Sequence, residues 1–402
     1  MTVLDKLQTR RKFTRFLIAA ALLGMVSGLF DNTINNYLSE VAHVTTTERG
    51  MIEFPREMPG FLVTLVAGAL VSLSLNRTGA VAISLLAAGL GTLSFLPVHM
   101  APMLACLIIW STGAHLYMPI SSSIALSLSS AERRATSLAQ VAAVGIVGTV
   151  FGAGIIAVAM SRHWISFRGV FLLAAGIAGV AAAVVGSMGR VEKPGQGKRQ
   201  AFVFKRRYWL YYLLCALYGV RKQVFMTFGV WVIVKNFRQP PSSIATLAII
   251  YCLIGIFTQQ VMGRAIDKWG EQRVLVTEGL VLAVVCAAYA LAGQYPGWQG
   301  ALYVVMAAYV VDQLAFAFSM ARTTYLSRIV EKSEDLSGGL AAGVSIDHAV
   351  SMTGPVIGTI VWQQYGFQYV FWASGVIALA SSAASLLIRL PRRAEAPATQ
   401  TA

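Results

Sequence analysis

Charged residues are scarce in this chain of 402 residues, and their scarcity excludes an ordinary soluble protein. Only 12% of the residues are charged, whereas 56% are hydrophobic. A soluble domain usually carries about 25% charged residues. No polar stretch is long enough to form a soluble domain of its own. The composition therefore predicts a protein that lies almost entirely within a membrane.

Cysteine is also rare, and its placement argues against disulfide and zinc frameworks. The four cysteines fall in separate apolar stretches without CxxC spacing, at Cys106, Cys215, Cys252 and Cys286. We expect them to be packing residues. The sequence has no GxxxxGK(S/T) loop for a nucleotide and no HxxxH pair for a metal. We therefore predict no cofactor, no bound metal and no catalytic residues.

The chain does contain twelve apolar stretches of membrane-spanning length, since a bilayer core needs about 20 apolar residues per helix. We expect helices at 13–37, 52–75, 79–97, 101–128, 138–160, 167–188, 208–234, 243–264, 272–293, 298–321, 338–362 and 367–389. A basic, glycine-containing linker at 190–207 divides them into two six-helix bundles, residues 1–189 and 208–402. Duplicated six-helix halves are typical of alternating-access transporters.

The net charge of +15 indicates how the chain is oriented in the membrane and does not indicate a nucleic-acid site. Most of the 32 lysines and arginines fall in loops on the side where both termini lie. The positive-inside rule then places both termini in the cytoplasm. We expect a monomer in the cell membrane, which in a bacterium is the inner membrane. We also expect anionic lipid to contact its basic inner face.

The loop after the eighth predicted helix carries a recognisable motif. Residues 263–273, GRAIDKWGEQR, resemble the GxxxD(R/K)xGx(R/K)(R/K) signature of the major facilitator superfamily. The equivalent loop of the first half, around Asn76, is degraded. The resemblance implies a fold of two pseudo-symmetric six-helix bundles, and a latch on the cytoplasmic side built from Arg264, Asp267 and Arg273. It also implies that helices 1, 4, 7 and 10 line the substrate cavity.

Ionisable residues occur on each of those four helices, where charge is costly and usually functional. The candidate substrate-binding residues are Asp31, Asn35, His115, Tyr117, Tyr218, Arg221, Lys222 and Asp312. Arg221 and Lys222 are adjacent, so at most one of them faces the cavity squarely. They either bind an anionic group of the substrate or form internal salt bridges with Asp312 and Asp347. Both interpretations stay open.

Proton coupling has four candidates: Asp31, Asp312, Asp347 and His348. Asp31 is either a coupling or substrate carboxylate or a structural partner of a basic residue. Histidine is the residue type that can carry a proton at physiological pH, but a single histidine among apolar residues, as at His115 and His348, is more often a packing residue. The residue types alone do not choose between these roles.

The second predicted helix opens with a dense charge cluster, EFPREMPG at 53–60. Glu53 can reach Arg56 and Glu57 at spacings of three and four residues. We expect Asp31, Arg56 and Glu57 to form a network that breaks and reforms as the outer side opens. The alternative is a solvated helix end.

The sequence thus predicts a secondary active transporter that is not an enzyme. We expect it to move a small organic solute, anionic or zwitterionic, with coupled protons. The alternatives are a proton-driven exporter of cationic or amphipathic drugs or metabolites and, less favoured, a metal-ion transporter.

Overall fold

The computed structural model describes residues 3–69, 73–96, 99–130, 133–191, 203–295 and 297–389, and these residues contain helices and no strand. The first half contains α1 (Val3–Phe30), α2 (Ile34–Asn36), η1 (Tyr37–Val41), α3 (Thr46–Ala69), α4 (Leu75–Phe95), α5 (Met100–Ser127), α6 (Arg134–Ala159) and α7 (Phe167–Gly186). The predicted all-α membrane fold is confirmed.

The second half contains η3 (Arg206–Tyr208), α8 (Trp209–Val224), η4 (Phe225–Gly229), η5 (Val232–Asn236), α9 (Pro241–Gln294), α10 (Ala301–Leu314), η6 (Ala315–Phe318), α11 (Ser319–Ile329), α12 (Ser333–Tyr365) and α13 (Phe367–Ser385). α9 is two helices joined at Gly270, whose φ of 81° is a left-handed backbone conformation that glycine adopts without strain.

Nine helices of the described chain are long and apolar enough to cross a membrane. α9 is one of the nine, and its break at Gly270 divides it into two of the expected spans. The second and seventh expected spans, α3 and α8 with its π-helical continuation, fall outside that set. α3 carries five charged residues and α8 carries two, Arg221 and Lys222, where a lipid-facing helix would be apolar. Most of the charges that lower the hydropathy of α3 line the site described below, and those of α8 form internal ion pairs.

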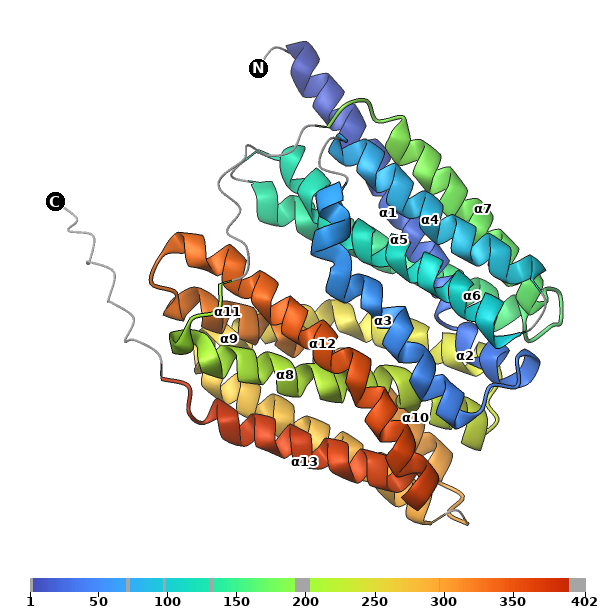
Figure 1. Cartoon of the computed structure of the whole chain (residues 1–402). Helices are drawn as coiled ribbons and strands as arrows, with labels where there is room; N and C mark the ends of the chain where they lie inside the picture. Colours follow the sequence, from blue (N-terminus) through green and yellow to red (C-terminus); the bar gives the residue numbers. More distant parts are fainter. Residues whose placement is uncertain are drawn as a thin grey trace.

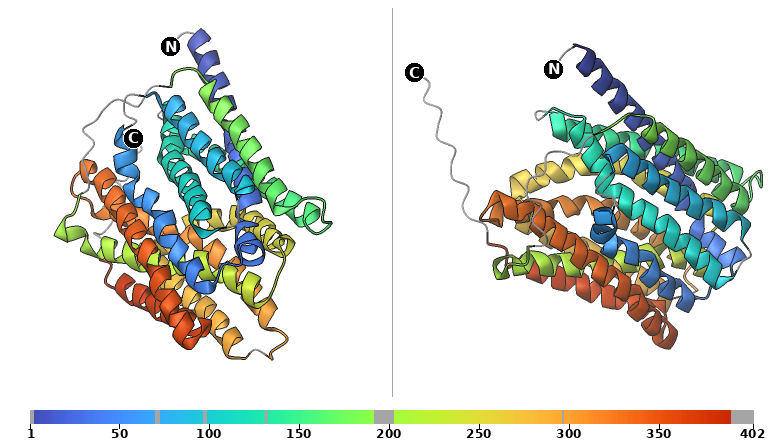
Figure 2. Two further views of the ribbon diagram at one scale, coloured as in Figure 1. Left: turned by 45° about the vertical axis from the view of Figure 1, so that its right-hand side comes forward. Right: turned by 45° about the horizontal axis from the view of Figure 1, so that its top comes forward.

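The helices form two groups that lie side by side (Figure 1, Figure 2). Within the first group α1 packs on α6 and α7, and α4 packs on α5 and α7. Within the second, α9 packs on α13 and α8 packs on α12. The groups meet where α3 packs on α12 and α6 packs on α9. The predicted linker lies mostly outside the described residues, so its bounds stay a prediction.

Glycines permit the closest helix contact, between α1 and α6. A Cβ on Gly24 would lie 2.0 Å from the carbonyl oxygen of Gly145, and one on Gly148 would lie 2.0 Å from that of Ala21. No side chain fits at these distances, so the two backbones touch as they do in small-residue membrane interfaces. This contact fixes α1, and with it the position of the residues at its end.

Candidate functional site

The first span is interrupted at Asp31, Asn32 and Thr33. The Asn32 amide donates a hydrogen bond to the Gly28 carbonyl at 2.6 Å, and the Thr33 hydroxyl donates one to the Leu29 carbonyl at 2.8 Å. Side chains of this kind compete with the backbone for helical carbonyl groups, which favours a helix break. The break leaves Asp31 exposed in the interior of the molecule, although its two neighbours are buried.

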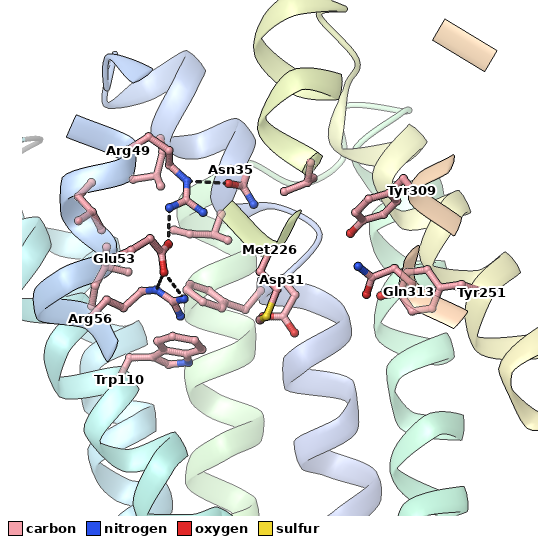
Figure 3. A pocket seen from close by; sticks show the side chains of 16 residues that line it. Asp31, Asn35, Arg49, Glu53, Arg56, Trp110, Met226, Tyr251, Tyr309 and Gln313 are labelled. Carbon is pink, nitrogen blue, oxygen red and sulfur yellow. Dashed lines mark hydrogen bonds and ion pairs between the residues drawn. The ribbon is translucent and has the colours of Figure 1, made fainter. Parts of the chain in front are cut away.

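Asp31 lines a cavity of about 190 Å³ between the two groups of helices. The polar and aromatic residues of its wall include Asn35, Trp110, Tyr251, Tyr309 and Gln313. In Figure 3, Asp31 lies between a cluster of arginines and Glu53 on one side and Tyr251, Tyr309 and Gln313 on the other. Of the predicted site residues, Asp31, Asn35 and Arg56 line this cavity.

One wall of the cavity carries Arg49, Glu53 and Arg56. Together with Glu57, which lies outside that wall, they form what we define as the α3 charge network. Buried Glu53 is its centre, because it contacts Arg49 four residues earlier and accepts a hydrogen bond from Arg56 Nε at 2.9 Å. Arg49 also donates to Asn35 Oδ1 at 3.0 Å. The sequence placed Glu53 within reach of Arg56, but it did not identify Glu53 as the residue that holds the group together.

Glu53 also joins the two halves. The amide of Gln223, in α8, donates a hydrogen bond to Glu53 Oε2 at 2.8 Å. Gln223 is buried and lies within one helical turn of Arg221 and Lys222, yet the sequence analysis did not select it. The available signal was an uncharged polar residue beside two cations in an otherwise apolar span.

Glu57 divides its two carboxylate oxygens between different partners. Oε1 lies 2.7 Å from Arg56 Nη2, and Oε2 lies 3.6 Å from His115 Nε2 and 3.3 Å from His348 Nδ1. The expected contact of Arg56 with Glu57 is therefore present. Asp31 makes no ion pair within the described part of the chain, so its membership of this network stays a prediction, as does the gating role.

The cations of the seventh span form internal salt bridges. Arg221 contacts Asp312 of α10, with both side chains buried, and Lys222 Nζ lies 2.6 Å from Asp347 of α12. This is the pairing that the sequence left as one of two alternatives. Neither cation lines the cavity at Asp31. Arg221 Nε and Nη2 have no hydrogen-bond partner within the described residues, but Arg221 lies outside this cavity, so its role in binding an anion stays a prediction.

A third ion pair in the second half, buried like Arg221–Asp312, was not anticipated. Arg322 of α11 lies 2.6 Å from Glu278 of α9, and its guanidinium stacks on the Tyr218 ring at 3.7 Å from the centroid. Tyr218 therefore packs against a cation and lies outside the cavity wall. Tyr117 likewise packs against the first-half core. The sequence signal for this pair was Glu278, a single acid in an apolar stretch, which the sequence analysis did not select.

The loop that resembles the family signature adopts the turn that its glycine predicts, with a φ of 81° at Gly270. Arg264, Asp267 and Arg273 are exposed, and their side chains make no hydrogen bond or ion pair within the described residues. The nearby ion pair is instead Glu271 with Arg328, at 2.7 Å. The latch assigned to the three residues stays a prediction.

The halves are hydrogen-bonded to each other at one end of the molecule. Asn36 donates to the Gln239 carbonyl at 2.9 Å, Trp231 donates to Thr46 at 3.2 Å, and Gln363 donates to Thr47. Together with Gln223–Glu53 and His348–Glu57, these bonds lie around the first three turns of α3. Within the described residues, no hydrogen bond joins the halves near the start of α1. The structure is thus closed at the end away from the N-terminus.

Comparison with known proteins identifies the fold. The sequence model of the Major Facilitator Superfamily matches residues 16–332 and 211–402. A mutant of the nucleoside transporter NupG is similar in structure, with a TM-score of 0.76 and 13% sequence identity over 94% of this chain and 99% of the other.

A second similar structure is a bacterial homologue of the human lysosomal transporter Spinster, solved in an inward-facing and unoccupied conformation. Its TM-score is 0.72, at 11% identity, over 95% of this chain and 97% of the other. At such identities the likeness establishes the fold alone. A comparison with curated protein sequences finds no match. The chain is a multi-pass membrane transporter, and it belongs to the Major Facilitator Superfamily.

Proposed function

We propose that this transporter moves a small zwitterionic organic solute by alternating access, and that its transport is coupled to protons through Asp31. The observation that carries the proposal is the state of Asp31: a carboxylate exposed to an interior cavity, with no salt bridge at contact distance among the described residues. Ionisable groups inside a membrane protein are expensive unless they are paired or serve a function. The second-half acids Asp312 and Asp347 form salt bridges, whereas Asp31 forms none within the described part of the chain.

The opposite wall supplies positive charge. Arg56 lines the cavity and uses Nε and Nη2 on Glu53 and Glu57. A guanidinium has five N–H donors in a fixed fork, so Arg56 retains capacity for a substrate carboxylate. An ammonium group at Asp31 and a carboxylate at Arg56 would place a zwitterion across the cavity.

The rest of the lining suits a small solute with a flat or apolar part. Trp110, Tyr251 and Tyr309 offer ring faces, while Asn35 and Gln313 offer amide hydrogen bonds. The cavity of about 190 Å³ is smaller than the roughly 300–1,000 Å³ typical of sites for drug-sized ligands. This size favours a metabolite over the amphipathic drugs of the alternative export function.

Proton coupling follows from competition at Asp31. A protonated Asp31 cannot pair with an ammonium group, whereas an ionised Asp31 can, so the proton and the cationic group exclude each other at one site. Asp312, Asp347 and His348 were further candidates for this role. Asp31 is favoured because it alone among these carboxylates faces the cavity without a partner.

The test uses purified protein in liposomes, with counterflow of labelled zwitterionic solutes and a pH-sensitive dye inside the vesicles. Nucleosides, the cargo named for NupG, join the panel as uncharged solutes. We expect Asp31→Asn to abolish solute-driven proton movement and Asp31→Glu to retain it. Wild-type proton movement in Asp31→Asn would refute the coupling role.

Arg56 separates the two substrate classes. If the solute is a zwitterion, Arg56→Gln should raise its apparent KM at least tenfold, because a charge-assisted hydrogen bond contributes about 1.5–3 kcal/mol. If the cargo is a simple cation, Arg56→Gln should leave its KM unchanged, and the zwitterion proposal fails.

A further inference from the structure

We propose that Glu57, His115 and His348 form a binding site for one divalent transition-metal ion of the zinc class, and that this ion ties the two halves together. The three residues come from α3, α5 and α12. Each offers one ligand atom, and these atoms lie within 4.8 Å of one another. The site is distinct from the cavity at Asp31, whose wall includes none of the three. Its test is therefore independent of the proposed substrate.

The two distances from Glu57 to the histidines suit a tetrahedral metal. Ligand atoms at about 2.0–2.1 Å from a tetrahedral zinc ion lie about 3.3–3.4 Å apart. Glu57 Oε2 lies 3.3 Å from His348 Nδ1 and 3.6 Å from His115 Nε2. Two imidazoles and one carboxylate are also a common zinc ligand set, which leaves the fourth position to water.

The hydrogen bonds of His115 show which of its ring nitrogens carries the proton. Nδ1 lies 2.9 Å from the Ser111 carbonyl oxygen, which can only accept, and 3.0 Å from Ser111 Oγ. Ser111 Oγ donates its one hydrogen to the Arg56 carbonyl, so it also acts as an acceptor toward His115. Nδ1 is therefore the protonated nitrogen, and in the neutral ring Nε2 presents a lone pair.

That lone pair faces Glu57 Oε2, which is also an acceptor. Two acceptors 3.6 Å apart, both in largely buried side chains, repel unless a cation lies between them. A metal-bound histidine usually donates its other N–H to a carbonyl or carboxylate, which orients the ring. His115 has this arrangement already, through Ser111.

Arg56 leaves one carboxylate oxygen of Glu57 free for the ion. Arg56 contacts Glu57 only through Oε1 and is also paired with Glu53, so Oε2 remains for the imidazoles. Gly60 provides the space. A Cβ there would lie 2.6 Å from His115 Cδ2 and 2.8 Å from His348 Cε1. Because His348 belongs to the second half and the other two ligands to the first, a bound ion would hold the closed end shut.

The experiment titrates Co²⁺ into the purified full-length protein, with its affinity tag removed, and follows the visible absorption of tetrahedral cobalt. We expect one Co²⁺ per chain, displaced by Zn²⁺. Affinity should fall about tenfold or more in His115→Ala and in His348→Ala, since even residues that only orient metal ligands cost about 10–100-fold when replaced. His99→Ala, an exposed histidine outside the site, is the matched control and should bind as the wild type does.

A second measurement needs no variant. Zn²⁺ should protect His115 and His348 of the wild-type protein from diethylpyrocarbonate, read by mass spectrometry, while His99 stays reactive. Absence of Co²⁺ binding to the wild type, unchanged affinity in His348→Ala, or unprotected His115 and His348 would each overturn the proposal. In the first case a proton would be the cation between the two acceptors.

Discussion

The two halves of this transporter neutralise their interior charges in different ways. In the first half, Arg49, Glu53, Arg56 and Glu57 all belong to α3 and pair at spacings of one to four residues. In the second half, Arg221–Asp312, Lys222–Asp347 and Arg322–Glu278 each join two different helices. Pairs within one helix survive a movement of that helix, whereas pairs between helices fix the helices relative to each other.

This difference assigns the halves different parts in a conformational change. The second half is braced by three interhelical ion pairs, so we infer that it moves as a rigid body. The α3 charge network instead travels with its helix, and its links to the other half, Gln223 and His348, are single hydrogen bonds. The unpaired Asp31 also lies in the first half. We therefore expect recognition and gating to concentrate there.

The largest expected effect comes from breaking one interhelical pair. Asp312→Leu leaves buried Arg221 without its partner, which costs about 3–5 kcal/mol for a buried pair. Thermal unfolding in detergent should show a large loss of Tm. The double variant Arg221→Met with Asp312→Leu should recover most of it, because no charge is then left uncompensated. A double variant as unstable as the single one would show that this pair does not brace the second half through its charges.

A smaller effect is expected at the centre of the α3 charge network. Glu53→Gln keeps the shape of the side chain but removes the charge shared by Arg49 and Arg56. We expect a loss of about 1–3 kcal/mol, since Asn35 and Glu57 still hold the two arginines. Thermal unfolding measures it. A loss as large as that of Asp312→Leu would contradict the contrast between the halves.

The smallest effect on stability is expected at the start of α12, which lies at the same end of the molecule as the N-terminus. Lys205 donates a hydrogen bond to Asp335 at 2.6 Å, and this bond lowers the pKa of Asp335 below its usual 3.8. A lowered carboxyl pKa stabilises the fold above the unfolded value, and this contribution disappears as the pH falls through the folded value. Lys205→Gln should therefore lower Tm slightly at neutral pH and have no effect in strong acid. If the variant lowered Tm equally at both pH values, the Lys205–Asp335 ion pair could not be the cause of the loss.

Much of the frame was predictable because it depends on local sequence. Most of the expected spans followed from apolar length, and the contact of Glu53 with Arg56 followed from helical spacing. The partners of Arg221 and Lys222 were among the alternatives because few acids lie at that depth. The Glu57–His115–His348 group was not predictable, since its members are brought together only by the packing of α3, α5 and α12. The pair Glu271–Arg328 was missed because the family signature directed attention to Asp267.

The widened turns in the first span of each half hold extra residues. η1 in the first span, and η4 and η5 in the seventh, are π-helical segments, in which each turn holds one residue more than an α-turn. Because a π-turn absorbs that residue locally, removing one residue from Phe225–Gly229 would restore an α-turn and leave Val230 in the cavity wall and Trp231 beside Thr46. A deletion in the regular helix of α8 would instead rotate all that follows by about 100°. Single-residue deletions should therefore be tolerated better in η4 than in α8.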